Sequence, residues 1–166
     1  MLSNFQDKKR STIQRKERQF IVFSIGDEKF GVDVAQIKQI IPVSDYTLVP
    51  NAPSFVRGVI DLRGDIIPII NLKERLAFRE ITRKAKDPKI IIVDLDNNRI
   101  GMEVDSVSEM IRVYLDEINE APDIVKGINR DYLYGVTKMG EHLLVLLDLG
   151  KILSKKEILE LDKIDI

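Results

Sequence analysis

The sequence predicts an all-β protein, because short apolar runs recur along the chain and turn residues separate them. Four pairs of such runs have the pattern of hairpins, and only two or three short helices are expected beside them. Short strands joined by frequent turns are typical of a barrel or a sandwich. The expected hairpins lie at residues 20–34, 56–72, 89–104 and 132–148.

The first hairpin shows the clearest alternation of apolar residues. Its first arm runs from Phe20 to a Gly26-Asp27 turn, and its second arm continues to Val34. Apolar side chains then recur at helical spacing from Val34 to Ile41. This spacing predicts a helix of about two turns that ends at Pro42.

The central hairpin follows two prolines and has a glycine at its turn. Pro50 and Pro53 favour an irregular entry, because each fixes φ and lacks a backbone donor. Arg63-Gly64 is expected to form the turn, since glycine accepts the positive φ of a tight reversal. Pro68 in the second arm indicates an edge strand or a bulge.

A polar segment at residues 81–88 is expected to separate the chain into two halves. The second half opens with β-branched residues at 89–95 and a turn at 96–98, and its last hairpin reverses at Met139-Gly140-Glu141. Ser154 and Glu157 have the spacing of a capping box. This spacing predicts a terminal helix that begins there.

Composition excludes several classes of protein. The 166 residues are 44% hydrophobic, enough for one sizeable core or for two small cores that share an interface. The 26 basic and 27 acidic residues give a net charge of −1, so no overall field attracts nucleic acid or anionic membranes. The chain has no cysteine, and no apolar stretch approaches the ~20 residues of a membrane helix. A cytoplasmic location is therefore expected.

Residues 1–18 are expected to form a flexible basic tail, because six basic and two acidic side chains lie there without a clear apolar period. An arm that binds membrane or nucleic acid is the alternative, but so few charges would bind only weakly. The folded domain is expected at residues 19–166.

No pattern in the sequence indicates catalysis, a metal or a cofactor. Three residues match the start of a calcium-binding loop (Asp94, Asp96 and Asn98), but a β-turn between strands is favoured, because an arginine stands where that loop needs glycine. His142 is the only histidine and lies beside a glycine turn. We therefore expect a protein without catalytic residues, metal or cofactor.

The central segment resembles the signature of the CheW family, the scaffold proteins that couple bacterial chemoreceptors to the histidine kinase CheA. The matching motifs are the Pro50 to Pro53 spacing, Val56-x-Gly58, Leu62-Arg63-Gly64 and Ile67-Pro68. The resemblance extends to the first hairpin, to Gly101–Val107 and to the closing strand and helix, and covers roughly residues 19 to 155. It implies two five-stranded SH3-like β-barrels packed side by side, intertwined and divided near residues 80–88, with a few short helices that include a C-terminal one.

The resemblance also implies binding residues. The family's receptor site is an apolar groove between the barrels, and the matching positions are Val34, Ile37, Ile41, Val104 and Val107. The sequence pattern alone favours a core position for each of these residues.

The second implied site lies at the central turn. Arg63, with Gly58 and Gly64, is implied to contribute to receptor or kinase coupling through hydrogen bonds or an interface ion pair. Many family members carry glutamate before the isoleucine of the short helix after the first hairpin. This chain has Gln36 there, so an ion pair from that position to Arg63 does not carry over.

The implied function is a non-enzymatic adaptor that binds the tip of a chemoreceptor coiled coil in the groove and pairs one barrel edge with the regulatory domain of CheA. The isolated protein is expected to be a monomer that is recruited to membrane receptor arrays without inserting into the membrane or binding nucleic acid. The alternative is a small β-barrel that binds nucleic acid, which the 6% aromatic content and the near-neutral charge disfavour.

Overall fold

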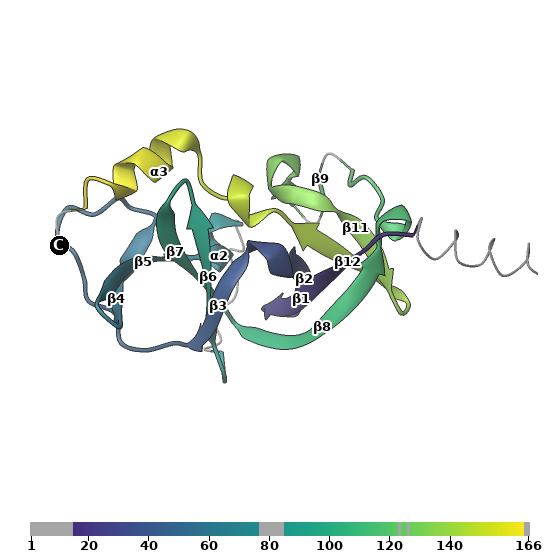
Figure 1. The fold of residues 1–166 in the computed structure, drawn as a ribbon, viewed down its shortest axis with the longest axis horizontal. Helices are drawn as coiled ribbons and strands as arrows, with labels where there is room; N and C mark the ends of the chain where they lie inside the picture. The colour runs from purple at the N-terminus through teal and green to yellow at the C-terminus, as the bar shows by residue number, and fades with distance from the viewer. Residues whose placement is uncertain (1–14, 77–84, 123, 126, 165–166) are drawn as a thin grey trace, which may run out of the picture.

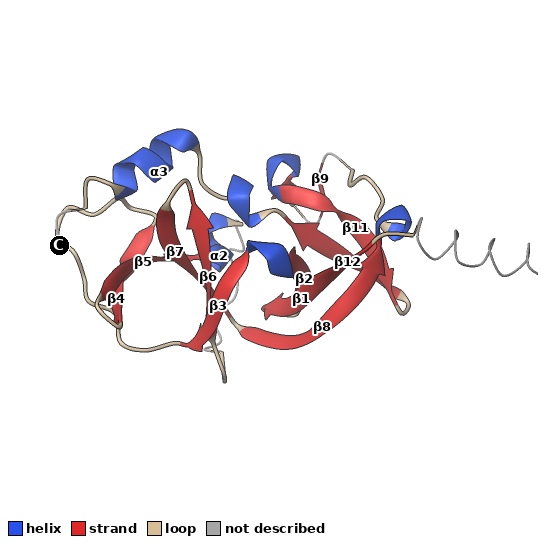
Figure 2. Ribbon diagram, viewed as in Figure 1, coloured by secondary structure: helices blue, strands red, loops and turns tan. Residues whose placement is uncertain are grey.

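The computed structural model describes residues 15–76, 85–122, 124–125 and 127–164 and shows two five-stranded sheets side by side (Figure 1). The first barrel has the strand order β11-β12-β2-β1-β8, and the second barrel has the order β3-β6-β7-β5-β4. Strands dominate the fold, with short helical segments between them (Figure 2). The predicted all-β fold of two SH3-like barrels is confirmed.

The strands of the first barrel are β1 (Glu17–Ile25), β2 (Glu28–Asp33), β8 (Ser106–Tyr114), β11 (Leu133–Met139) and β12 (His142–Leu147). Those of the second barrel are β3 (Ile37–Pro42), β4 (Val56–Leu62), β5 (Asp65–Asn71), β6 (Lys89–Leu95) and β7 (Asn98–Val104). A separate two-stranded sheet pairs β9 (Ile124–Val125) with β10 (Ile128–Asn129).

The described α-helices are α2 (Leu72–Arg75) and α3 (Lys155–Leu161). Four 3₁₀ turns accompany them in the described part of the chain: η1 (Val34–Gln36), η2 (Leu115–Glu117), η3 (Arg130–Tyr132) and η4 (Leu149–Lys151). Within the described residues, no helix combines the length and apolar character needed to cross a membrane.

The four predicted hairpins are confirmed. At the central turn Gly64 has the predicted positive φ (91°), and Arg63 also lies in the left-handed region (54°). Pro68 lies in an interior strand, but β5 pairs with β7 only from Ile69 onward. Pro68, which has no backbone N–H to donate, therefore lies at a point where β5 is paired only with β4.

The two barrels are built from an internal repeat. Residues 20–43 align without a gap to residues 90–113, and residues 56–72 align in the same way to residues 133–149. Strands β1 to β5 of the first repeat correspond in order to β6, β7, β8, β11 and β12 of the second, and each pair occupies the same position in its sheet.

The two repeats exchange their first hairpins. Hairpin β1–β2 of the first repeat pairs with β8 and β12 of the second, and hairpin β6–β7 pairs with β3 and β5 of the first. Each barrel therefore contains strands from both halves of the chain. The predicted division near residues 80–88 lies between the two repeats, and β5 and β6 on either side of it belong to one sheet.

The folded chain begins earlier than predicted. β1 starts at Glu17, which pairs with Tyr114 of β8, and the guanidinium of Arg15 lies 3.6 Å from the centre of the Tyr114 ring. Residues 15–18 thus belong to the first barrel, where a strand that the sequence pattern did not reveal supplies their partner. The rest of the predicted tail, residues 1–14, lies outside the described residues.

The predicted helix over residues 34–41 is wrong. Only the single turn η1 is helical, and β3 follows at once, paired with β6. The register shifts between Ile37 and Gln39, so Lys38 is an extra residue in a β-bulge. The bulge directs Ile37 and Ile40 toward the same core, three positions apart, which is the spacing of a helix.

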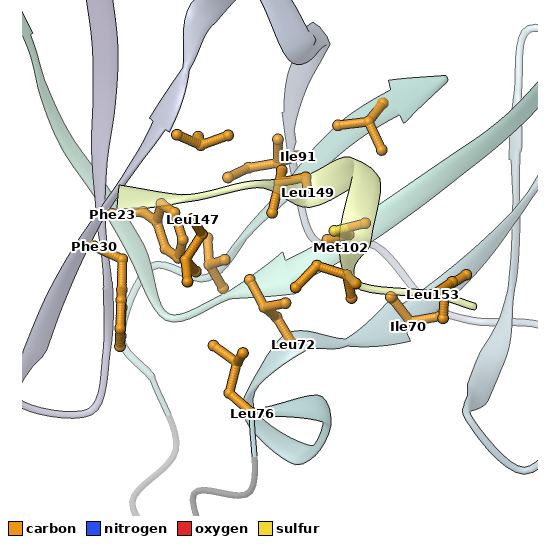
Figure 3. Close-up of a cluster of buried hydrophobic side chains, with 14 of the residues drawn as sticks. Phe23, Phe30, Ile70, Leu72, Leu76, Ile91, Met102, Leu147, Leu149 and Leu153 are labelled. Carbon is orange, nitrogen blue, oxygen red and sulfur yellow. The ribbon is translucent and has the colours of Figure 1, made fainter. Parts of the chain in front are cut away.

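One hydrophobic core runs through both barrels (Figure 3). It joins Phe23 and Phe30 of the first barrel to Ile70 and Met102 of the second, and all four side chains are almost completely buried. Each barrel also has a smaller cluster of its own. Because the largest core is shared, the barrels cannot separate without exposing apolar surface to water.

The C-terminal segment connects the two barrels across their outer surface. It leaves the first barrel at β12, and α3 then lies over the second barrel (Figure 1). Arg75 of α2 donates from Nε to the carbonyl oxygen of Ile152 (2.9 Å) and pairs with Glu157. The predicted capping box is confirmed: the amide of Glu157 donates to Oγ of Ser154 (3.1 Å), and the amide of Ser154 donates to Glu157 Oε1 (2.9 Å).

These contacts lower the pKa of Glu157. Partial burial alone would raise this pKa, but the hydrogen bonds from the Ser154 backbone and from Arg75 outweigh it. A carboxyl group with a lowered folded pKa stabilises the fold above its unfolded pKa of about 4.3, and this stabilisation disappears as the pH falls through the folded value.

We therefore predict that Glu157→Gln lowers the free energy of unfolding at pH 7 by about 1 kcal/mol, and that this loss becomes smaller toward pH 3 as the wild-type carboxyl takes up a proton. Glutamine can still cap α3, so the difference reports the charge. Urea unfolding at both pH values measures it, with Glu160→Gln as a control on the same helix. An equal loss of stability at both pH values would contradict the prediction.

Candidate functional site

Half-exposed apolar side chains of both barrels pack against the shared core. They are Ile21, Ile37, Ile40 and Val107. Met110 lies directly opposite Ile21 in the β1–β8 pairing and is 52% exposed. We call these five apolar residues on β1, β3 and β8 the junction face.

The junction face follows from the internal repeat. Ile37 and Ile40 of β3 occupy the positions that Val107 and Met110 occupy in β8. The pairing of β1 with β8 also contains a bulge, and Ser108 is its extra residue. Each repeat thus contributes one bulged strand with two apolar residues to the junction.

The structure separates the predicted groove residues into two groups. Val34, Ile37 and Val107 are half-exposed at the junction. Ile41 is also half-exposed and packs against the smaller cluster of the second barrel, whereas Val104 is 1% exposed within the shared core. Of the five residues, only Val104 is inaccessible in the free protein.

Three members of the junction face were missed by the sequence analysis: Ile21, Ile40 and Met110. Ile21 has the alternation of a strand and gave no sign of its exposure. Met110 lies on β8, which was not predicted, because its exposed residues show no alternation. The internal repeat could have identified both Met110 and the strand, since Met110 aligns with Ile40.

Gln36 links the repeats behind the junction face. Its Nε2 donates to Oδ1 of Asp148 (2.7 Å), and its Oε1 accepts from the backbone amide of Leu149 (3.2 Å). Asp148 Oδ1 also accepts from the amide of Gly150 (2.9 Å) and so caps η4. The amide of Gln36 satisfies a donor and an acceptor of the other repeat at once.

Asp105 forms a second link, where the chain passes from β7 in the second barrel to β8 in the first. Its Oδ1 lies 3.3 Å from Nζ of Lys73, and its Oδ2 accepts from the amide of Gly26 (2.6 Å). The Asp105 amide donates to the carbonyl oxygen of Ser24 (2.9 Å). Both side chains of the ion pair are about one-fifth exposed, so the interaction is only partly screened by water.

A polar cluster surrounds Glu103 in the second barrel. Its carboxylate accepts hydrogen bonds from Tyr46 Oη (2.6 Å), Arg57 (3.0 Å) and Asn71 (3.3 Å). Burial, together with the hydrogen bond to Glu103, raises the pKa of Tyr46 well above its usual value. The tyrosine therefore stays a neutral donor at physiological pH.

The first barrel has the corresponding cluster, in which Asp33 occupies the place of Glu103. Asp33 accepts from Arg18 (2.9 Å), whose guanidinium lies 6.0 Å from the centre of the Tyr134 ring. Asp33 is the last residue of β2 and Glu103 the second-to-last of β7, so each cluster lies where the chain leaves the first hairpin of its repeat.

The central turn presents Arg63 to solvent. Arg63 makes no ion pair or hydrogen bond with the other described residues, whereas Gly64 donates its amide to Oδ1 of Asp61 (2.8 Å). Gly58 lies farther along β4, where an added Cβ would come within 2.9 Å of the Thr47 carbonyl oxygen. Gly58 therefore allows a loop to cross the outer edge of β4.

The part of the chain that the structure describes contains no assembled set of metal ligands. Among the described residues, no group of three or more His, Cys, Asp or Glu side chains could hold an ion. Asp94, from the calcium-loop pattern, instead contacts Lys38 (3.5 Å) and Arg99 (3.3 Å). The segment is the turn between β6 and β7 that the sequence predicted.

The comparisons with known proteins agree on one family. The model of the CheW-like domain matches residues 19–157. The chain is 32% identical over 152 residues to the chemotaxis protein CheW of Treponema pallidum, with 90% of this chain and 89% of the relative covered. It is 30% identical over 147 residues to the chemotaxis protein CheW of Klebsiella aerogenes, with 89% and 88% covered.

A solved structure has the same fold. The crystal structure of the scaffolding protein TtCheW from Thermoanaerobacter tengcongensis superposes with a TM-score of 0.76 at 29% identity and covers 86% of this chain and 91% of its own.

We predict that Gln36→Glu lowers the free energy of unfolding by about 1–3 kcal/mol, because a carboxylate cannot donate to Asp148 and repels it. Adding Asp148→Asn should recover part of the loss, since it removes the like charge beside position 36. Denaturant unfolding of the two single variants and the double variant measures this coupling. Additive losses in the double variant would contradict the proposed link.

Proposed function

Because the chain belongs to the CheW family, we propose that it is a non-catalytic chemotaxis adaptor that joins the cytoplasmic tip of a chemoreceptor to the histidine kinase CheA. The observation that supports this proposal is the junction face, apolar side chains of both barrels that remain partly exposed, four of them packed against the shared core. Such a surface suits a partner helix that presents an apolar stripe.

The receptor contact is proposed at the junction face. A chemoreceptor tip is a coiled-coil hairpin, and a helix that lies between the barrels would cover apolar side chains from both repeats. Ile37 and Val107 keep their proposed place from the family resemblance, Val34 lies at the border, and Ile21, Ile40 and Met110 are added. Binding would bury apolar surface that already rests on packed residues, so little ordering is needed.

The kinase contact is proposed at the β4–β5 hairpin that carries Arg63. An exposed guanidinium without a partner among the described residues can form a charge-assisted hydrogen bond at an interface at little cost within the free protein. The regulatory domain of CheA is the proposed partner, and receptor arrays at the cytoplasmic side of the membrane are the proposed location. Multiple weak contacts in an array would reinforce one another.

We predict that Val107→Glu weakens binding of a chemoreceptor cytoplasmic fragment at least about tenfold while the protein remains folded, because a half-exposed carboxylate stays hydrated until a partner arrives. Val104→Glu should instead unfold the protein, because its side chain is 1% exposed. Thermal melts and receptor pull-downs measure both effects.

The matched control is Leu143→Glu, which makes the same kind of change at a 47% exposed leucine on β12, outside the junction face. It should leave receptor binding unchanged. Undiminished binding by a folded Val107→Glu protein would show that the receptor contact lies elsewhere.

We also predict that Arg63→Ala reduces kinase binding or activation with a change in stability within about 0.5 kcal/mol, because the side chain is exposed and has no hydrogen bond or ion pair with the described residues to lose. Lys138→Ala, at an exposed position on β11, is the control for loss of one surface charge. Binding to CheA and receptor-coupled kinase activity are the measurements. Identical activity of the two variants would remove Arg63 from the proposed contact.

A further inference from the structure

The internal repeat has a consequence for self-association that is independent of the adaptor function. The first repeat spans β1 to α2 (residues 15–76), and the second spans β6 to α3 (residues 89–161). Within each repeat, the extended backbone pairing is confined to hairpins: β1–β2 and β4–β5 in the first, β6–β7 and β11–β12 in the second.

The pairing that completes the barrels runs between the repeats. Four pairings do this: β1 with β8, β2 with β12, β3 with β6, and β5 with β7. The shared core and the hydrogen bonds of Gln36 to Asp148 and Leu149 also join one repeat to the other. Each repeat is therefore a complementary binding surface for the other.

One covalent connection joins the repeats. It spans residues 77–88, a length of 12 residues that reaches at most about 40 Å when extended. The pairings between repeats depend on the strands themselves and not on this connection. They can form equally well when the two repeats come from different molecules.

We propose that each repeat of this chain can bind the complementary repeat of a second copy, giving an exchanged dimer with two complete double barrels. The buried core and the strand pairings are the same in monomer and dimer. The balance is set by the connection, which gives the monomer a high effective concentration of its own second repeat, and by chain concentration. The monomer is thus the form at low concentration.

The two forms interconvert slowly. Exchange requires the four pairings between repeats and the shared core to break, which amounts to unfolding of the domain. The dimer should therefore arise when the chain folds at high concentration and persist after dilution. Simple mixing of folded monomers should not produce it.

The absence of cysteine allows a direct test on the whole chain. Gln19 of β1 and Arg112 of β8 are cross-strand partners from different repeats. The double variant Gln19→Cys/Arg112→Cys is unfolded, refolded at a series of chain concentrations, separated by size and oxidised. A disulfide then links two chains in the exchanged dimer and closes within one chain in the monomer.

We expect the ratio of dimer to monomer to rise about tenfold for each tenfold rise in concentration while the monomer predominates. The oxidised dimer fraction should run as a covalent dimer on a denaturing gel without reductant. The control is Lys138→Cys/Leu143→Cys, a cross-strand pair within the second repeat, which should give only single chains.

Two outcomes would overturn the proposal. A dimer fraction of the Gln19→Cys/Arg112→Cys variant that oxidises to single chains would show association through outer surfaces. The lack of any dimer after refolding across the series would show that the repeats bind only within one chain. Glu17→Cys/Tyr114→Cys, in the same strand pairing, replaces the first pair if that variant does not fold.

Discussion

The shared hydrophobic core between the barrels is the constraint on which the rest of the fold depends. It places Phe23 of the first barrel and Met102 of the second in one cluster, and the last residues of α3 complete it. Each barrel combines three strands of one repeat with the first hairpin of the other repeat. The loss of one hairpin would therefore open one barrel and leave edge strands unpaired in it. The two barrels are therefore expected to unfold together, and the residues that stabilise the fold also fix the mutual orientation of the barrels.

The junction face is a product of this construction. The bulges in β3 and in the β1–β8 pairing each add one residue, which brings two apolar side chains per repeat to the same side of the sheet. The core beneath them is already filled, so Ile37 and Val107 pack on it without being covered. Apolar surface left in water forgoes about 25 cal/mol per Å² of possible burial, and a partner that covers it recovers this free energy. The proposed receptor contact thus needs no rearrangement of the barrels.

Local signals made the hairpins and the terminal capping box predictable, because alternation, turn residues and Ser154-to-Glu157 spacing each act within a few residues. The exchange of hairpins was not predictable in this way, since it depends on which strands meet across the chain. The bulge in β3 imitates helical spacing, and this explains the wrong helix. Burial of Val104, in contrast to Val107, depends on the sheet that covers the side chain. The repeat is the signal in the sequence that carries this long-range information.

A glutamine at position 36 is consistent with its surroundings. Asp148 caps η4 with its carboxylate, and a second carboxylate beside it would meet like charge in a half-buried site. An amide instead donates to Asp148 and accepts from Leu149, so the link across the repeats is kept without an ion pair. Gln36 also offers no carboxylate to Arg63. Its charge is therefore not committed within the described part of the fold, and an interface that supplies a carboxylate would gain a hydrogen-bonded pair without first breaking one.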